Sequence, residues 1–181
     1  HLQNSLTLDN NVLERLEIIL GPGSVIYGSD ALGGVMHFYS KNPKLSDNDT
    51  LEIQTQLLAR YASANSEKTT HLDFNFGLKK FAALSSLSFS DFGDLRQGGR
   101  RDPQYPDFGK RLFYVDRIND VDVVLQNSNP NIQKQSGYKQ YNFLQKFLYR
   151  KNDVVNHVLN FQYSTSSDIP RYDRLTQIKN D

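Results

Sequence analysis

One short segment shows a strict alternation of apolar and polar residues, and this pattern constrains the fold more than any other feature of the chain. In residues 71–79, Leu72, Phe74, Phe76 and Leu78 take every second position, and polar residues or glycine lie between them. Successive side chains of a β-strand point to opposite faces of the sheet. The spacing therefore predicts a strand with one apolar and one polar face.

Four further segments show the same alternation and are predicted as strands: residues 51–61, 81–91, 141–150 and 155–164. Each has about ten residues, the length that a tilted strand needs to cross a membrane. Their ends carry aromatic side chains, as an interfacial girdle requires: Tyr61, Phe81, Tyr141, Tyr149 and Tyr163. In the full-length protein, Phe74→Arg or Phe76→Arg is expected to abolish assembly into a membrane. Asn75→Arg, on the polar face, is not expected to do so.

The connections between these segments alternate in length. Leu78 and Phe81 flank Lys79-Lys80 and both belong to the apolar face, as the two ends of a two-residue hairpin turn require. The connection at about 92–136 is roughly 45 residues long and is predicted to be a loop without regular structure. Short turns at one edge and long loops at the other are typical of a membrane barrel.

Periodicity alone leaves two architectures open, because a soluble antiparallel β-sandwich shows the same alternation. A sandwich would indicate a soluble or surface binding module, such as a lectin or an adhesin. The hydrophobic fraction of 38% and the mean hydropathy of −0.60 do not separate the two, since polar lumen-facing residues lower the average of a barrel strand. No run approaches the roughly 18 apolar residues of a membrane helix, which excludes a helical membrane protein.

Composition and motifs exclude several classes of function. Lysine and arginine number 21 against 20 acidic residues, so nucleic acid is not an expected partner. Cysteine is absent, which removes thiolate metal sites and cysteine nucleophiles. Gly23–Gly28 is spaced like a phosphate loop, but Ser29-Asp30 follows where Lys and Ser or Thr are required. No enzyme, metal or cofactor is predicted, because the histidines stand singly: His1, His37, His71 and His157.

The first forty residues follow another pattern, in which glycine separates short apolar runs. Residues 16–20 and 35–39 are predicted as strands, and residues 24–27 as a one-turn helix capped by Ser24. Four glycines are predicted to serve the architecture of tight turns rather than to contact a ligand: Gly21, Gly28, Gly33 and Gly34.

Residues 13–36, LERLEIILGPGSVIYGSDALGGVM, resemble the closing signature of the plug domain of TonB-dependent outer-membrane receptors. The resemblance implies that residues 1–45 are the C-terminal part of a small α+β plug. Residues 46–181 would then form the N-terminal part of an antiparallel transmembrane β-barrel. The chain is expected to be a fragment that lacks the TonB box, the front of the plug and most of the barrel. The implied location is the outer membrane of a Gram-negative bacterium.

The same resemblance implies active uptake of a scarce solute, with an iron source such as haem or a siderophore as the expected cargo. The implied partners are the TonB–ExbB–ExbD complex, reached through the missing N-terminal segment, outer-membrane lipid, and the iron chelate or haem itself. Residues 168–175 resemble sequences of haem receptors in this family, which favours haem.

Two groups of candidate site residues follow from the resemblance and the loop composition. Glu14, Arg15 and Glu17 match family positions whose charges lie between plug and barrel wall, although a solvated amphipathic edge would carry the same residues. The extracellular loops are expected either to contact the ligand or only to pack over the barrel mouth. Their candidate contacts combine charge with aromatic rings: Arg100, Arg101, Tyr105, Arg171 and Tyr172.

Overall fold

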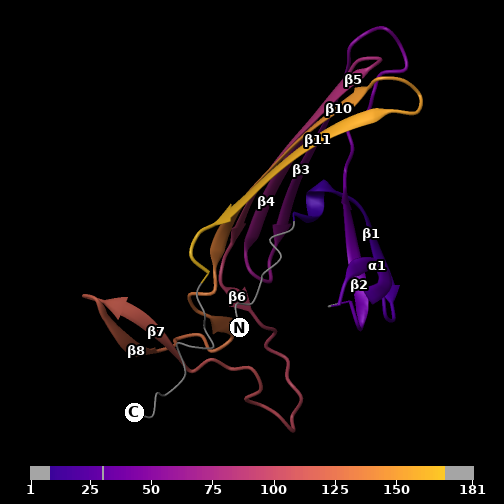
Figure 1. The fold of residues 1–181 in the computed structure, drawn as a ribbon. Coiled ribbons are helices and arrows are strands. Elements are labelled where there is room, and N and C mark those ends of the chain that lie inside the picture. The colour runs from indigo at the N-terminus through magenta and orange to yellow at the C-terminus, as the bar shows by residue number, and fades with distance from the viewer. Residues whose placement is uncertain (1–8, 30, 170–181) are drawn as a thin grey trace. The chain divides into compact units, whose positions relative to one another are not determined.

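The computed structural model describes residues 9–29 and 31–169, and it is mostly β with antiparallel sheets (Figure 1). In the described part of the chain, no helix is both long and apolar enough to cross a membrane. The elements are the 3-10 helix η1 (Asn10–Val12), β1 (Leu13–Leu20), α1 (Ser24–Tyr27), β2 (Gly34–Ser40), β3 (Glu52–Ala62), β4 (Glu67–Gly77), β5 (Phe81–Phe92), β6 (Leu95–Arg96), β7 (Phe113–Ile118), β8 (Val121–Gln126), β9 (Ile132–Gln133), β10 (Tyr138–Arg150) and β11 (Asn156–Ser166).

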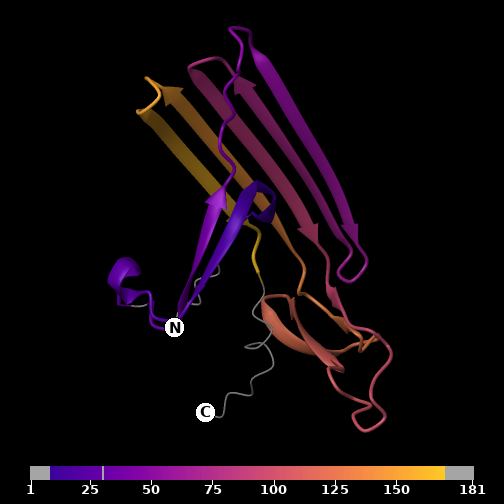
Figure 2. The same cartoon turned by 90° about the vertical axis from the view of Figure 1, so that its right-hand side faces the viewer.

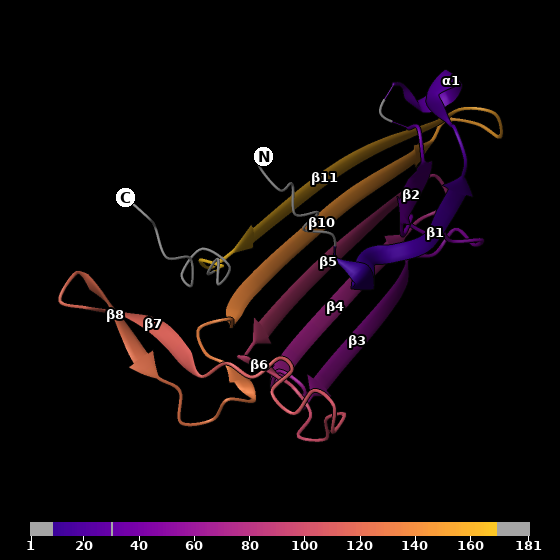
Figure 3. The same ribbon diagram turned by 90° about the horizontal axis from the view of Figure 1, so that it is seen from below.

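The five long strands form one sheet in the order β11-β10-β5-β4-β3 (Figure 3). All five match strands that the alternation predicts, with β4 beginning four residues earlier than expected, at Glu67. The turn at Lys79-Lys80 is confirmed, because the Leu78 amide donates to the Phe81 carbonyl at 2.7 Å. Among the described residues β3 and β11 are the outer strands, so this sheet is open and does not close into a barrel.

The long connection between β5 and β10 is not structureless, which corrects the sequence-based prediction. It contains a hairpin of β7 and β8 and a short antiparallel pair of β6 with β9. Asn119 and Asp120 form the hairpin turn and both have positive φ, at 50° and 63°. Two successive residues with positive φ are the mark of a type I′ turn, whose twist suits a two-residue hairpin.

The described residues divide into two compact units. The first holds residues 9–57, 71–88 and 142–164, and the second holds residues 58–70, 89–141 and 165–169. The candidate site below lies in the first unit, and the cavity of the long connection lies in the second.

On β4 and β5 the polar face of the sheet is mostly buried, and the apolar face is half-buried or exposed. On β3 and β11 both faces are mostly exposed. Along β4 the buried positions are Glu67, Thr69, His71, Asp73, Asn75 and Gly77, while Leu72, Phe74 and Phe76 are half-buried or exposed. The exposed set includes the predicted girdle aromatics and several large aliphatic residues: Ile53, Leu57, Tyr61, Leu78, Phe81, Leu87, Tyr141, Phe147, Tyr149, Leu159, Phe161 and Tyr163. This is the reverse of the usual distribution in a soluble domain.

β1 and β2 form an antiparallel hairpin, and α1 lies in the connection between the two strands (Figure 2). The helix falls on the predicted residues, and the strands extend the predicted ones by one to three residues at their ends. The side chain of Ser24 lies outside the described atoms, so its predicted capping role stays a prediction. At Gly34 φ is +153°, and an added Cβ would lie 2.8 Å from the Ile19 carbonyl oxygen, so only glycine fits there.

Candidate functional site

The polar face of β4 and β5 carries a connected group of buried side chains with Asp73 at its centre. Strand alternation places His71, Asp73 and Asn75 on one face of β4, and Ser86 and Ser88 on the same face of β5. Asp73 accepts a short hydrogen bond from the Ser86 hydroxyl and pairs with the Lys41 ammonium at 2.6 Å. The carboxylate thus links both strands to the segment that follows β2.

His71 joins Asp73 to a second segment of the chain. Its side chain is 1% exposed, and its Nδ1 lies 2.6 Å from the Ser88 hydroxyl oxygen. Ser88 donates its proton to Asp9 in a short hydrogen bond. A hydroxyl has one proton, so Ser88 must accept from His71, and this bond requires a proton on Nδ1. The other nitrogen, Nε2, lies 2.9 Å from Asp73 as a contact without hydrogen-bond geometry.

Residues 42–46, termed the linker, are held mainly through backbone atoms. The Lys44 amide donates to the Asn75 side-chain oxygen at 2.8 Å, and the Asn75 amide group donates to the Lys44 carbonyl at 2.9 Å. The Ser46 amide donates to the Leu78 carbonyl at 3.2 Å. Gly77 leaves room for this approach, because a Cβ there would lie 2.5 Å from the Lys44 carbonyl oxygen.

Glu14 is connected to the sheet through the side chain of Asn42. Lys146 of β10 donates to the Ser40 carbonyl at 3.0 Å and to the Asn42 side chain at 3.1 Å, and Asn42 in turn donates to Glu14 at 3.4 Å. Lys146 is buried, so these two acceptors offset part of the cost of removing its charge from water.

Arg15 and Glu17 pair with each other on the β1–β2 hairpin, with 3.1 Å between the guanidinium and the carboxylate. Tyr39 of β2 donates to Glu17 at 3.1 Å, and the Arg15 guanidinium lies 4.0 Å from the centre of the Tyr39 ring. A hydrogen bond with Tyr39, and then the nearby carboxylates, raise the pKa of Arg15. An ion network from Arg15 and Glu17 to a barrel wall stays a prediction.

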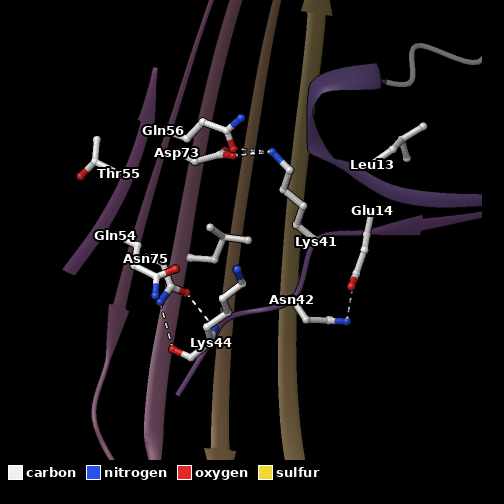
Figure 4. Close-up of a pocket in the computed structure, with 11 residues that line it drawn as sticks. Leu13, Glu14, Lys41, Asn42, Lys44, Gln54, Thr55, Gln56, Asp73 and Asn75 are labelled. Atoms are coloured by element: carbon white, nitrogen blue, oxygen red, sulfur yellow. Dashed lines mark hydrogen bonds and ion pairs between the residues drawn. The ribbon is translucent and has the colours of Figure 1, made fainter. Parts of the chain in front are cut away.

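A cavity of about 450 Å³ lies beside the linker, as Figure 4 shows. Most of the residues that line it are polar, and the Lys41 and Asp73 side chains meet across it. Glu14 is the predicted site residue among the lining residues, which are Leu13, Glu14, Lys41, Asn42, Lys44, Gln54, Thr55, Gln56, Asp73, Asn75 and Leu84. The chemistry of this lining suits water and polar chain segments.

Three predicted ligand contacts gather around one cavity of about 430 Å³ in the long connection. Arg100, Arg101 and Tyr105 line it together with Gln97, Gly98, Asp102 and Phe108. Arg101 holds the loop itself, since its three nitrogens donate to Asn131, to the Phe108 carbonyl and to the Gly99 carbonyl. Arg100 is exposed, and its guanidinium is available to a ligand. Nearby, the hydrogen bond from Lys110 lowers the pKa of Asp107.

The two arginines are expected to respond differently to truncation. Arg101→Ala removes three hydrogen bonds of roughly 0.5–1.5 kcal/mol each, partly screened by solvent, and should open the segment around Phe108. We expect chymotryptic cleavage after Phe108 in the full-length protein to become roughly tenfold faster. The reason is that the free energy needed to open the segment locally falls by about 1.4 kcal/mol. Arg100→Ala is the matched control and should leave the cleavage rate unchanged. Equal rates for the two variants would show that Arg101 does not brace the loop.

The remaining candidates divide into described and undescribed residues. Arg171, Tyr172 and His1 lie outside the residues that the structure describes. His37 stacks on Tyr39 with ring centres 4.2 Å apart, and His157 stacks on Tyr149 at 6.2 Å. Within the described range, histidine and acidic side chains form no group able to hold a metal ion.

Sequence reasoning missed the group around His71, which it treated as an isolated strand residue. The group draws its members from four distant parts of the chain, so no local motif contains it. A usable signal was present on β4, where His71, Asp73 and Asn75 alternate with apolar residues, and on β5, where Ser86, Ser88 and Ser90 do the same. Such runs of small or hydrogen-bonding residues on one strand face indicate a face that another part of the protein covers.

Comparison with known proteins gives one partial similarity. Two curated sequences match, both described as iron-regulated outer membrane virulence protein, from the classical Ogawa 395 and El Tor Inaba N16961 strains of Vibrio cholerae serotype O1. Each is 33% identical over 55 residues, which cover 30% of this chain and 8% of the relative. No protein-family model matches the chain, and no solved structure matches it.

Proposed function

We propose that this chain is part of a TonB-dependent outer-membrane receptor for an iron source. The observation that carries the proposal is the reversed burial on β4 and β5, where polar side chains are covered, while phenylalanine, leucine and tyrosine are exposed across the five-stranded sheet. A lipid bilayer is the solvent that makes such a sheet favourable, because it takes up the apolar face without cost.

The exposed apolar residues are too numerous for a free surface in water. They extend over β3, β4, β5, β10 and β11, and soluble monomers seldom expose a continuous apolar patch of more than a few hundred Å². Aromatic residues lie near the strand ends, where rings with a polar edge suit the boundary between lipid and water. Both features support a strand set that faces lipid.

Two other observations support the iron source and the dependence on TonB. The two Vibrio cholerae proteins are described as iron-regulated outer membrane proteins, which supports an iron-related role for this chain. Residues 13–36 carry the plug-like signature, and within them β1 pairs with β2 and the connection contains the helical turn α1. We therefore propose that this hairpin belongs to a plug, and that TonB–ExbB–ExbD drives uptake of haem or a siderophore, with haem favoured.

A soluble sandwich-type binding module is the competing function. In that fold the apolar faces of two sheets pack together and the polar faces meet water. In this structure the segments around Asp9 and Lys41 instead cover the polar face of the sheet. This arrangement favours the receptor over the sandwich.

Two measurements on the full-length protein test the proposal. Fractionation should recover it from the detergent-extracted outer membrane, with a gel mobility that changes on heating. Recovery only from the soluble periplasm would contradict the receptor. Disruption of the gene should then impair growth on haemin or haemoglobin as sole iron source, while growth on ferrous salt continues. Normal growth on haemin together with a defect on a glycan or cobalamin would contradict an iron source as the substrate. The assignment as a receptor would still stand.

A further inference from the structure

The two segments that cover the polar face are attached to the sheet in different ways. We propose that Asp9 and Ser88 form a releasable latch on the segment before β1, while the linker is a permanent anchor. The proposal rests on the proposed function, in which the sheet is part of the barrel wall. On that wall the contact between Asp9 and Ser88 opens, and the contact of the linker stays closed.

The linker is attached by contacts that a side-chain rotation cannot release. Asn75 bonds both the amide and the carbonyl of Lys44, and the Ser46 amide bonds the Leu78 carbonyl. Because Gly77 has no side chain, the linker backbone lies against the backbone of β4. Opening this contact would leave several buried backbone groups unpaired, which is costly.

The segment before β1 is attached to the sheet by a side-chain bond. Asp9 is the N-cap of η1, and its Oδ1 accepts from the amide and the side chain of Asn11 at 2.9 and 3.0 Å. This local turn leaves the other oxygen, Oδ2, for the Ser88 hydroxyl. Apolar support comes from Val12, which is buried in a cluster with Leu84 and Leu144.

Release of Asp9 removes the acceptor of the Ser88 hydroxyl, and it leaves the charged groups of the polar face paired. His71 still bonds Ser88, and Asp73 keeps Ser86 and Lys41. The Asp9 carboxylate returns to water with its Asn11 bonds intact. Opening therefore breaks one charge-assisted hydrogen bond and the packing of Val12, and it leaves no unpaired buried charge on the sheet. A contact with these properties suits a part that must move away and return.

Hydrogen exchange on the purified full-length receptor tests the latch without reference to its cargo. Ser88→Ala should raise exchange of peptides within residues 9–20 about tenfold, and Asp9→Ala at least as much, because it also removes the bonds to Asn11. The double variant should add little to Asp9→Ala, because Ser88→Ala removes a bond that Asp9→Ala already removes. Peptides within residues 42–50 should keep their rates. Ser86→Ala is the matched control on the same strand face, and it should leave residues 9–20 unchanged.

Three outcomes would overturn the proposal. These are no change at residues 9–20 in Ser88→Ala, an equal rise at residues 42–50, or the same effect from Ser86→Ala. Hydrogen exchange is measured on purified protein and tests the latch, whereas fractionation tests the receptor assignment. Failure of one proposal is therefore distinguishable from failure of the other.

A reversible cross-link tests movement in cells. The 181 residues contain no cysteine, so Asp9→Cys with Ser88→Cys can be bridged by a short bis-methanethiosulfonate with little background from this region. Haemin uptake should fall at least tenfold and recover with dithiothreitol. The same bridge across the exposed ion pair of Asp49 and Lys79, as Asp49→Cys with Lys79→Cys, should not reduce uptake. If the parent receptor takes up haemin and uptake stays normal with positions 9 and 88 bridged, release of Asp9 from Ser88 is refuted. If the parent takes up no haemin, exchange alone decides.

Discussion

Phe74→Arg in the full-length protein is expected to abolish assembly into the outer membrane. Phe74 lies on the apolar face of β4, where its ring stacks 6.4 Å from that of Phe76. An arginine on the lipid face of a barrel costs about 2–4 kcal/mol near the midplane and less near the surfaces. Position 74 is nearer the middle of β4 than position 76, so Phe76→Arg should have the smaller effect.

The matched control for this prediction is Gln54→Arg rather than Asn75→Arg. Asn75 lies on the polar face as expected, but it is 7% exposed and bonds the linker backbone, so arginine does not fit there. Gln54 is exposed on the polar side and lines the cavity of about 450 Å³, which has room for a longer side chain. Membrane-fraction yield and heat-dependent gel mobility measure assembly. Equal assembly of Phe74→Arg and Gln54→Arg would show that the apolar face does not meet lipid.

The alternation of residues 71–79 predicted the strand and its two faces, yet it did not show which face is buried. Periodicity is the same whether the apolar side meets a protein core or a bilayer. The burial of His71, Asp73 and Asn75 decides this point, and it depends on segments 9–12 and 40–46 that no local pattern connects with β4. The sequence therefore predicts strands far better than it predicts what covers them.

The long connection shows the opposite case, in which a local signal was present and was not used. Residues 113–118 and 121–126 are rich in valine, isoleucine and aromatic residues, and Asn119-Asp120 separates them. This is a hairpin signature, since both turn residues tolerate positive φ. The contacts of Arg101 could not be predicted in the same way, because its acceptors are two carbonyls and the side chain of Asn131, thirty residues away.

Gly77→Val is expected to detach the linker from the sheet and to destabilise the protein strongly. A Cβ at position 77 would lie 2.5 Å from the Lys44 carbonyl oxygen and 3.0 Å from the Ser46 nitrogen. These are backbone atoms, so they cannot rotate away as a side chain would, and the linker must move. Overpacking costs about 1–3 kcal/mol, and each displaced linker bond adds about 1 kcal/mol. With the three linker bonds displaced, the total expected loss is roughly 4–6 kcal/mol.

The loss should appear as a lower urea midpoint of the purified receptor in detergent, with faster hydrogen exchange at residues 42–50. Gly33→Val is the matched control, because an added Cβ there meets no atom within 4 Å and its φ is not in the left-handed region. It should leave both measurements unchanged. Since Gly77 lies at the anchor and not at the latch, exchange at residues 9–13 should rise less than at residues 42–50. A Gly77→Val protein with normal exchange in the linker would mean that the close backbone approach does not hold the linker in place.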